Sequence, residues 1–240
     1  MTNLTLDLEI TRATLLQRWN NPHPDFASGQ DQRSSDRGLL ELLYGSMEHG
    51  AHFNWHNAGR TLIDKTYLAI LWAAQGLAPL SISFEQLAAC LDAFIRDELA
   101  PEWESLAELE HETRHQRTLE LVNAASVRLF GSQPNPTAAS QLLLFLCPQL
   151  PLFPYSEKHR HALERLAPAH TINNYADYHR ACRTQLAIRL PALQPDRTAV
   201  QASTHNPELN RLLQHSDWWS RRLLAEQIVV EALVVRTAYA

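Results

Sequence analysis

Apolar residues recur along this 240-residue chain at helical spacing, and clusters of turn-forming residues separate one apolar stretch from the next. Helix-start signals agree with this spacing. Ser83 is followed three residues later by Gln86, as in a capping box, and Asn135 precedes Pro136, which suits a cap followed by a first helical residue. The pattern predicts helices over 6–19, 38–50, 60–75, 84–99, 101–130, 136–146, 155–166, 173–190, 207–214 and 217–237.

Two of these helices depend on how local signals are weighed. Pro191 predicts the end of the helix over 173–190, because proline lacks the backbone N–H that a helix interior requires. The last segment holds the β-branched run 228–235, which favours a strand, but its length and apolar spacing favour a buried helix. We therefore expect an all-α fold, built as one compact multi-helix domain or as two helical lobes.

Composition supports this fold class and excludes others. The chain has only seven glycines, too few for the tight turns of a sandwich or barrel. It also lacks a glycine-rich phosphate loop and any other cofactor motif, so we expect no cofactor. The three cysteines are widely spaced, and we expect buried free thiols in a reducing compartment. No basic leader and no membrane-length apolar run occur, so we expect a cytoplasmic protein without a membrane partner.

Charge divides the chain into two parts. Residues 1–150 carry 10 basic and 18 acidic side chains, whereas residues 151–240 carry 11 and 8. We expect an acidic N-terminal helical part, 1–130, and a C-terminal helical part, 131–240, with a basic face. An acidic protein binds nucleic acid only through such a local basic face.

The basic residues of the C-terminal part are interleaved with aromatic and imidazole side chains. This mixture is typical of surfaces that contact phosphates and stack bases, although ordinary solvated helix faces have the same composition. The candidate nucleic-acid-binding residues are Tyr155, Lys158, Arg160, Arg165, Arg180 and Arg183.

An acidic stretch offers an alternative function. Glu102, Glu104 and Glu108 lie in the first turns of the helix predicted over 101–130, where acidic side chains also favour the helix dipole. A basic protein partner would dock on such a surface. This alternative makes the chain a protein-interaction or adaptor module.

A third hypothesis comes from His111-Glu112-Thr113-Arg114-His115, which matches the HExxH pattern of zinc hydrolases. On a helix, His111 and His115 share a face and could hold a metal while Glu112 serves as general base. The charged residues around them and the lack of an evident third ligand favour a structural role. A second group, His49, His52 and His56, surrounds a turn and lacks a nearby cysteine, so we expect no metal there.

The residues from Ala138 to Ser156 carry a family resemblance. They read AASQLLLFLCPQLPLFPYS, and His161-Ala162-Leu163 and Tyr175-Ala176-Asp177-Tyr178 follow them. This segment resembles the A-S-K-x-L-H-F-L-x-P-x-x-F-P-x-Y-D stretch of bacterial proteins distantly related to 8-oxoguanine DNA glycosylase, which have the helix-hairpin-helix fold. The resemblance covers residues 129–182.

The chain departs from that family at its functional positions. Pro134 and Pro136 stand where the family's hairpin offers backbone N–H groups to a DNA phosphate. The family's catalytic lysine has no counterpart, and Ser156 replaces its aspartate. The resemblance therefore implies a degenerate, non-catalytic helical scaffold that contacts nucleic acid or a nucleoprotein complex. It also implies a role in a bacterial defence or mobile-element system.

Overall fold

Helices dominate the part of the chain that the computed structural model describes, which is residues 65–75, 77, 79–103, 105–168, 171–203 and 217–238. Helical residues make up 74% of this part, far above the average of about 30–35%, and it contains no strand. The all-α prediction is confirmed. The helices predicted over 6–19, 38–50 and 207–214 lie outside the described residues, as do His49, His52 and His56.

The chain divides into two compact units, Met1–Pro101 and Glu102–Ala240. We expected a division into helical parts 1–130 and 131–240. Helix α5 (His111–Phe130) instead belongs to the second unit, because it packs against α6 (Pro136–Leu146). The acidic segment and the basic segment are therefore parts of one unit.

The described part of the first unit consists of α3 (Lys65–Ala74) and α4 (Phe84–Phe94), which pack together. The predicted capping box begins α4: Gln86 N donates to Ser83 Oγ at 3.2 Å, and Ser83 N donates to Gln86 Oε1 at 3.0 Å. A π-helical turn, Ile95–Leu99, follows α4 directly. The buried apolar side chains of the unit are Leu68, Leu71, Trp72, Leu87, Leu91, Phe94, Ile95 and Leu99.

The single helix predicted over 101–130 is wrong. Two short 3-10 turns, Ala100–Glu102 and Ser105–Ala107, precede α5, which begins at His111. Glutamates four residues apart repel each other on a helix, and this segment would place several in that register. Glu102 instead binds the guanidinium of Arg117, 15 residues later, which a continuous helix would hold about 22 Å away.

Helices α5 and α6 form a hairpin whose turn matches the sequence signals. Gly131 ends α5 at a φ of 66°, a value that glycine adopts without strain. Asn135 Oδ1 then accepts from Ala138 N at 2.9 Å, and Pro136 is the first residue of α6. Every residue of α6 from Ala138 to Leu146 is buried, so this helix is the core of the second unit.

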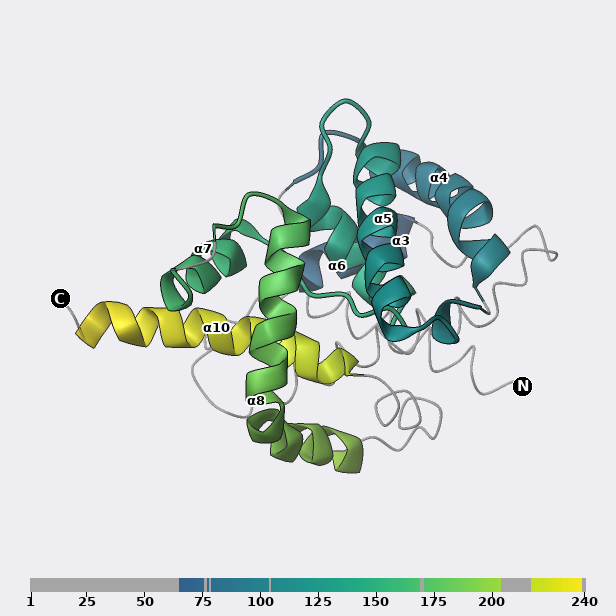
Figure 1. Cartoon of the computed structure of the whole chain (residues 1–240). Coiled ribbons are helices and arrows are strands. Elements are labelled where there is room, and N and C mark those ends of the chain that lie inside the picture. The colour runs from purple at the N-terminus through teal and green to yellow at the C-terminus, as the bar shows by residue number, and fades with distance from the viewer. Residues whose placement is uncertain are drawn as a thin grey trace. The chain divides into compact units, whose positions relative to one another are not determined.

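Three further helices complete the described part of the second unit: α7 (Glu157–Leu166), α8 (Tyr175–Ser203) and α10 (Trp218–Ala238). Both α7 and α8 contact α10, and α8 runs across it (Figure 1). The predicted helix end at Pro191 is wrong, because α8 continues through that residue. A proline removes one intrahelical hydrogen bond but does not stop the chain from resuming helical geometry. The β-branched run of α10 is helical, as predicted.

Candidate functional site

The connector between α6 and α7, residues 147–156, is mostly buried and contains three prolines. Prolines cannot donate a backbone hydrogen bond, and the carbonyl groups of a buried segment require donors from elsewhere. Side chains of α8 and α10 provide these donors. Several polar side chains in the interior of the second unit are therefore hydrogen-bonded to backbone carbonyls of this connector.

Arg221 of α10 holds three of the connector's carbonyls. Its Nε donates to Leu152 O at 2.9 Å, and its Nη2 donates to Leu150 O at 2.9 Å and to Pro148 O at 3.4 Å. The residue is only 6% exposed. Burial lowers its pKa to about 10, which still leaves the guanidinium charged at neutral pH. Arg221 is therefore a buried structural arginine, bound to backbone oxygens.

Three side chains of α8 hold further carbonyls of the same connector. The bonds join Tyr175 Oη to Phe153 O (3.3 Å), Tyr178 Oη to Pro154 O (2.9 Å) and His179 Nε2 to Pro151 O (2.9 Å). Burial raises the pKa of both tyrosines and lowers that of His179 to about 4. Burial therefore keeps all three groups neutral at pH 7, and each retains the proton that it donates to a carbonyl.

Tyr155 does not lie where a stacking residue must lie. Its side chain is only 5% exposed, and its ring packs against Tyr175 and Tyr178 at centroid distances of 5.7 Å and 5.0 Å. The expected stacking of Tyr155 on a base is therefore wrong. The Phe153-Pro154-Tyr155 stretch, part of the segment that carries the family resemblance, belongs to the unit's core.

The basic residues of α7 differ in what they contact. Arg160 donates to Glu157 at 2.7 Å and 3.1 Å and to Glu164 at 2.9 Å, so two carboxylates occupy its guanidinium. Lys158 and Arg165 are exposed. Of the three predicted contact residues on this helix, Lys158 and Arg165 are available to a partner.

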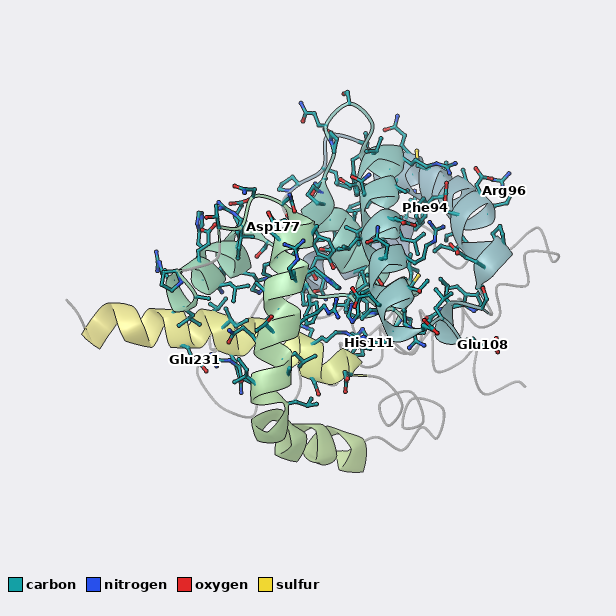
Figure 2. The ribbon with its side chains drawn as sticks, in the orientation of Figure 1. Phe94, Arg96, Glu108, His111, Asp177 and Glu231 are labelled. Carbon is teal, nitrogen blue, oxygen red and sulfur yellow. The ribbon has the colours of Figure 1, made fainter. Side chains whose placement is uncertain are left out.

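The basic residues of α8 also differ. Arg180 is 76% exposed, and its nearest carboxylate, Asp177 Oδ1, lies 3.6 Å from Nη1, beyond normal hydrogen-bond length. Arg183 instead donates to both oxygens of Glu112 on α5, at 3.1 Å and 2.9 Å. Figure 2 shows Asp177 near one end of α8 and His111 at the beginning of α5.

The acidic surface that would dock a basic protein is partly occupied by the chain itself. Glu102 binds Arg117, and the neighbouring Glu112 binds Arg183. Glu108 is exposed, and Glu104 lies outside the described residues. This pairing weakens the docking hypothesis, because two of the segment's carboxylates are already bound.

His111 and His115 do lie together, and the structure adds His179 from α8, 64 residues away. His115 Nε2 is 3.3 Å from His111 Nε2, and His115 Nδ1 is 3.4 Å from His179 Nε2. His111 is exposed, whereas His115 and His179 are 6% and 1% exposed. The three imidazoles form a row from the surface to the Pro151 carbonyl.

Hydrogen bonding assigns the protons along this row. The Pro151 carbonyl can only accept, so His179 carries its proton on Nε2. The same protonated nitrogen lies 3.4 Å from His115 Nδ1, which therefore cannot carry a proton of its own without opposing it. The proton of His115 therefore resides on Nε2 and points to His111. Burial, with a further contribution from His179, lowers the pKa of His115 to about 3 and keeps the ring neutral.

This assignment does not fit a zinc site at His111 and His115. The metal would need His115 Nε2 without its proton, and the displaced proton on Nδ1 would oppose the N–H of His179. Glu112, the candidate general base, binds Arg183. Within the described ranges, no three His, Cys, Asp or Glu side chains are grouped to hold a metal.

Two of the three cysteine thiols, like the buried tyrosines and His179, have a structural role in the interior. Cys147 and Cys182 are buried, as expected, whereas Cys90 is half-buried. Burial raises the pKa of the Cys147 thiol and raises that of Cys182 to about 12. Neither thiol is an activated nucleophile, because the thiolate is the reactive form.

Sequence and structure comparisons do not assign the chain to a family. No helix in the described part of the chain is long and apolar enough to cross a membrane. Comparison of the chain with protein-family models, with curated proteins and with solved structures finds no match.

Proposed function

We propose that this chain is a non-catalytic helical protein that contacts nucleic acid, or a nucleoprotein complex, through exposed basic side chains of α7 and α8. The contact residues are Lys158, Arg165 and Arg180. The resemblance of residues 129–182 to degenerate glycosylase-fold proteins supports this proposal. We further propose that the protein acts in the bacterial cytoplasm, within a defence or mobile-element system.

The observation that carries the proposal is the exposure of Arg180. It is 76% exposed, with its nearest carboxylate 3.6 Å away. A guanidinium in this setting can offer its planar fork to a phosphate without first losing a close partner. Lys158 and Arg165 on α7 add two exposed cations to the same unit.

The interior supports a non-catalytic role. Arg221, Tyr175, Tyr178 and His179 donate to backbone carbonyls, and the thiols of Cys147 and Cys182 are buried and neutral. A general acid or base needs a pKa near the working pH and a route to substrate. The pKa values of His115 and His179, about 3 and 4, do not meet the first requirement.

Salt-dependent binding tests the proposal. The full chain is titrated with labelled single- and double-stranded DNA and RNA between about 50 and 200 mM salt. We expect weak binding that falls steeply with salt and is similar across sequences, because phosphate contacts position a protein without reading bases. Base excision is expected to be absent.

A charge-matched control separates contact from net charge. Arg165→Ala with Arg180→Ala should lower the salt slope by up to ~2, since two phosphate contacts are lost. Arg96→Ala with Arg128→Ala removes the same charge from other helices and should leave the slope unchanged. Absence of salt-sensitive binding to every nucleic acid would refute the proposal, and a co-purifying basic protein would then favour the adaptor alternative.

A further inference from the structure

Glu112 and Arg183 form a two-point ion pair at the surface of the second unit. Arg183 Nη1 lies 3.1 Å from Glu112 Oε1, and Nη2 lies 2.9 Å from Oε2. The residues are 71 positions apart, on α5 and α8. The Glu112 side chain is 77% exposed and that of Arg183 is 30% exposed, so solvent and ligands can reach the pair.

The geometry of this pair is that of an arginine bound to a phosphate. Two guanidinium N–H groups face two oxygens of one planar anion, which is the arrangement that phosphate oxygens also accept. Arg183 lies one helical turn after the exposed Arg180, so the two side chains share a face of α8. A phosphate backbone that contacts Arg180 therefore extends to the guanidinium of Arg183, which Glu112 already occupies.

We propose that Glu112 is an intramolecular phosphate mimic that masks Arg183, and that nucleic acid must displace it to use this arginine. The inference rests on the proposed function and adds its regulation. An exposed ion pair is weak and screened by salt, so a phosphate can replace the carboxylate. The released carboxylate then lies beside the bound phosphate and repels it. Glu112 thereby lowers the affinity of the free protein for any nucleic acid.

The Glu112 carboxylate stays charged under ordinary conditions. Its hydrogen bonds to Arg183 hold its pKa below the usual range, and the two nearby histidines, His115 and His111, lower it slightly further. The mask is therefore present at neutral pH. Glu112→Gln removes the charge and one of the two acceptor oxygens while keeping the length of the side chain, so it weakens the hold on the guanidinium of Arg183.

A double-mutant cycle tests the mask. Binding of a labelled oligonucleotide to the full chain is measured for the wild type, Glu112→Gln, Arg183→Ala and the double variant. Glu112→Gln should tighten binding by about two- to fivefold, the size expected for release of an exposed pair. Arg183→Ala should weaken binding little in the wild type and clearly more in the Glu112→Gln background, where this arginine is held more weakly.

Glu108→Gln is the matched control, because it removes one exposed negative charge from the same segment without releasing an arginine. An equal gain from Glu108→Gln and Glu112→Gln, or an equal effect of Arg183→Ala in both backgrounds, would overturn the mask. The proposed function would survive that result, since the wild type still binds. If neither the wild type nor any variant binds nucleic acid, both proposals fail.

Discussion

The buried connector and the outer faces of α7 and α8 use the same kinds of side chain in opposite ways. In the connector, arginine, tyrosine and histidine donate to backbone carbonyls and lie out of reach of solvent. On the outer faces, arginines contact carboxylates of the same chain or extend into solvent. Residue type alone therefore does not identify the functional surface. What separates the two regions is the burial of each donor and the kind of partner it has: backbone carbonyls in the interior, and carboxylates or solvent on the outer faces.

The largest expected effect belongs to Arg221. Arg221→Met keeps much of the side-chain volume but leaves Leu152 O and Pro148 O without the arginine donor and removes one of the two donors to Leu150 O, so we expect a loss of at least about 3 kcal/mol in unfolding free energy. Arg165→Ala, at an exposed position, should change stability by less than about 0.5 kcal/mol. Urea unfolding followed by circular dichroism measures both. Similar losses of unfolding free energy in the two variants would contradict the distinction between a structural interior and an exposed surface.

The next effect sharpens the role of the tyrosines. Tyr178 is fully buried, and its hydroxyl donates to Pro154 O at 2.9 Å. Tyr178→Phe should therefore cost about 1–3 kcal/mol, because the carbonyl loses its donor. Tyr155→Phe is the control, since the described residues offer its hydroxyl no hydrogen bond, and it should cost less. Thermal unfolding measures the stability of both variants. A larger loss of stability in Tyr155→Phe than in Tyr178→Phe would contradict this account.

Acid should weaken the interior through its histidines. The folded pKa values of His115 and His179 are about 3 and 4, below the ordinary value of 6.5. The unfolded chain therefore binds more protons as the pH falls below about 6.5, and stability is lost from there down toward pH 4. Each histidine contributes up to ~1.4 kcal/mol per pH unit.

Between pH 6.5 and 4.5 these histidines are the main expected source of change, because carboxylates with lowered pKa values, such as Glu112, titrate below this window, although burial raises the pKa of Asp92. Unfolding free energy is measured at several pH values across this range. His179→Gln should flatten the dependence of the unfolding free energy on pH. A stability that stays constant from pH 6.5 to 4.5 would show that these imidazoles are not buried as neutral groups.

Local signals in the sequence predicted local structure well. The capping box at Ser83 and Gln86 and the start of α6 at Asn135 and Pro136 involve residues three or fewer positions apart. The groups that interact are therefore neighbours in the sequence and can be recognised from it. Pro191 was a misleading signal of the same kind. Its lost hydrogen bond is a fixed local cost, whereas packing elsewhere along α8 decides whether the helix continues.

The candidate site depended on contacts that no local pattern contains. His115 meets His179 across 64 residues, Arg183 meets Glu112 across 71, and Arg221 meets Leu150 across 71. The sequence identified the basic residues but not which of them were already bound. The burial of Tyr155 was missed because the irregular, proline-rich connector has no periodicity to indicate which side chains face inward.

The most direct test combines binding and stability in two variants. Arg165→Ala with Arg180→Ala should lower the salt slope of nucleic-acid binding by up to ~2 while leaving the unfolding free energy nearly unchanged. Arg221→Met should lower the unfolding free energy by at least about 3 kcal/mol and, under conditions where it remains folded, keep the wild-type salt slope. Equal salt slopes for the wild type and the Arg165/Arg180 double variant would contradict the proposed division between a structural interior and a binding surface.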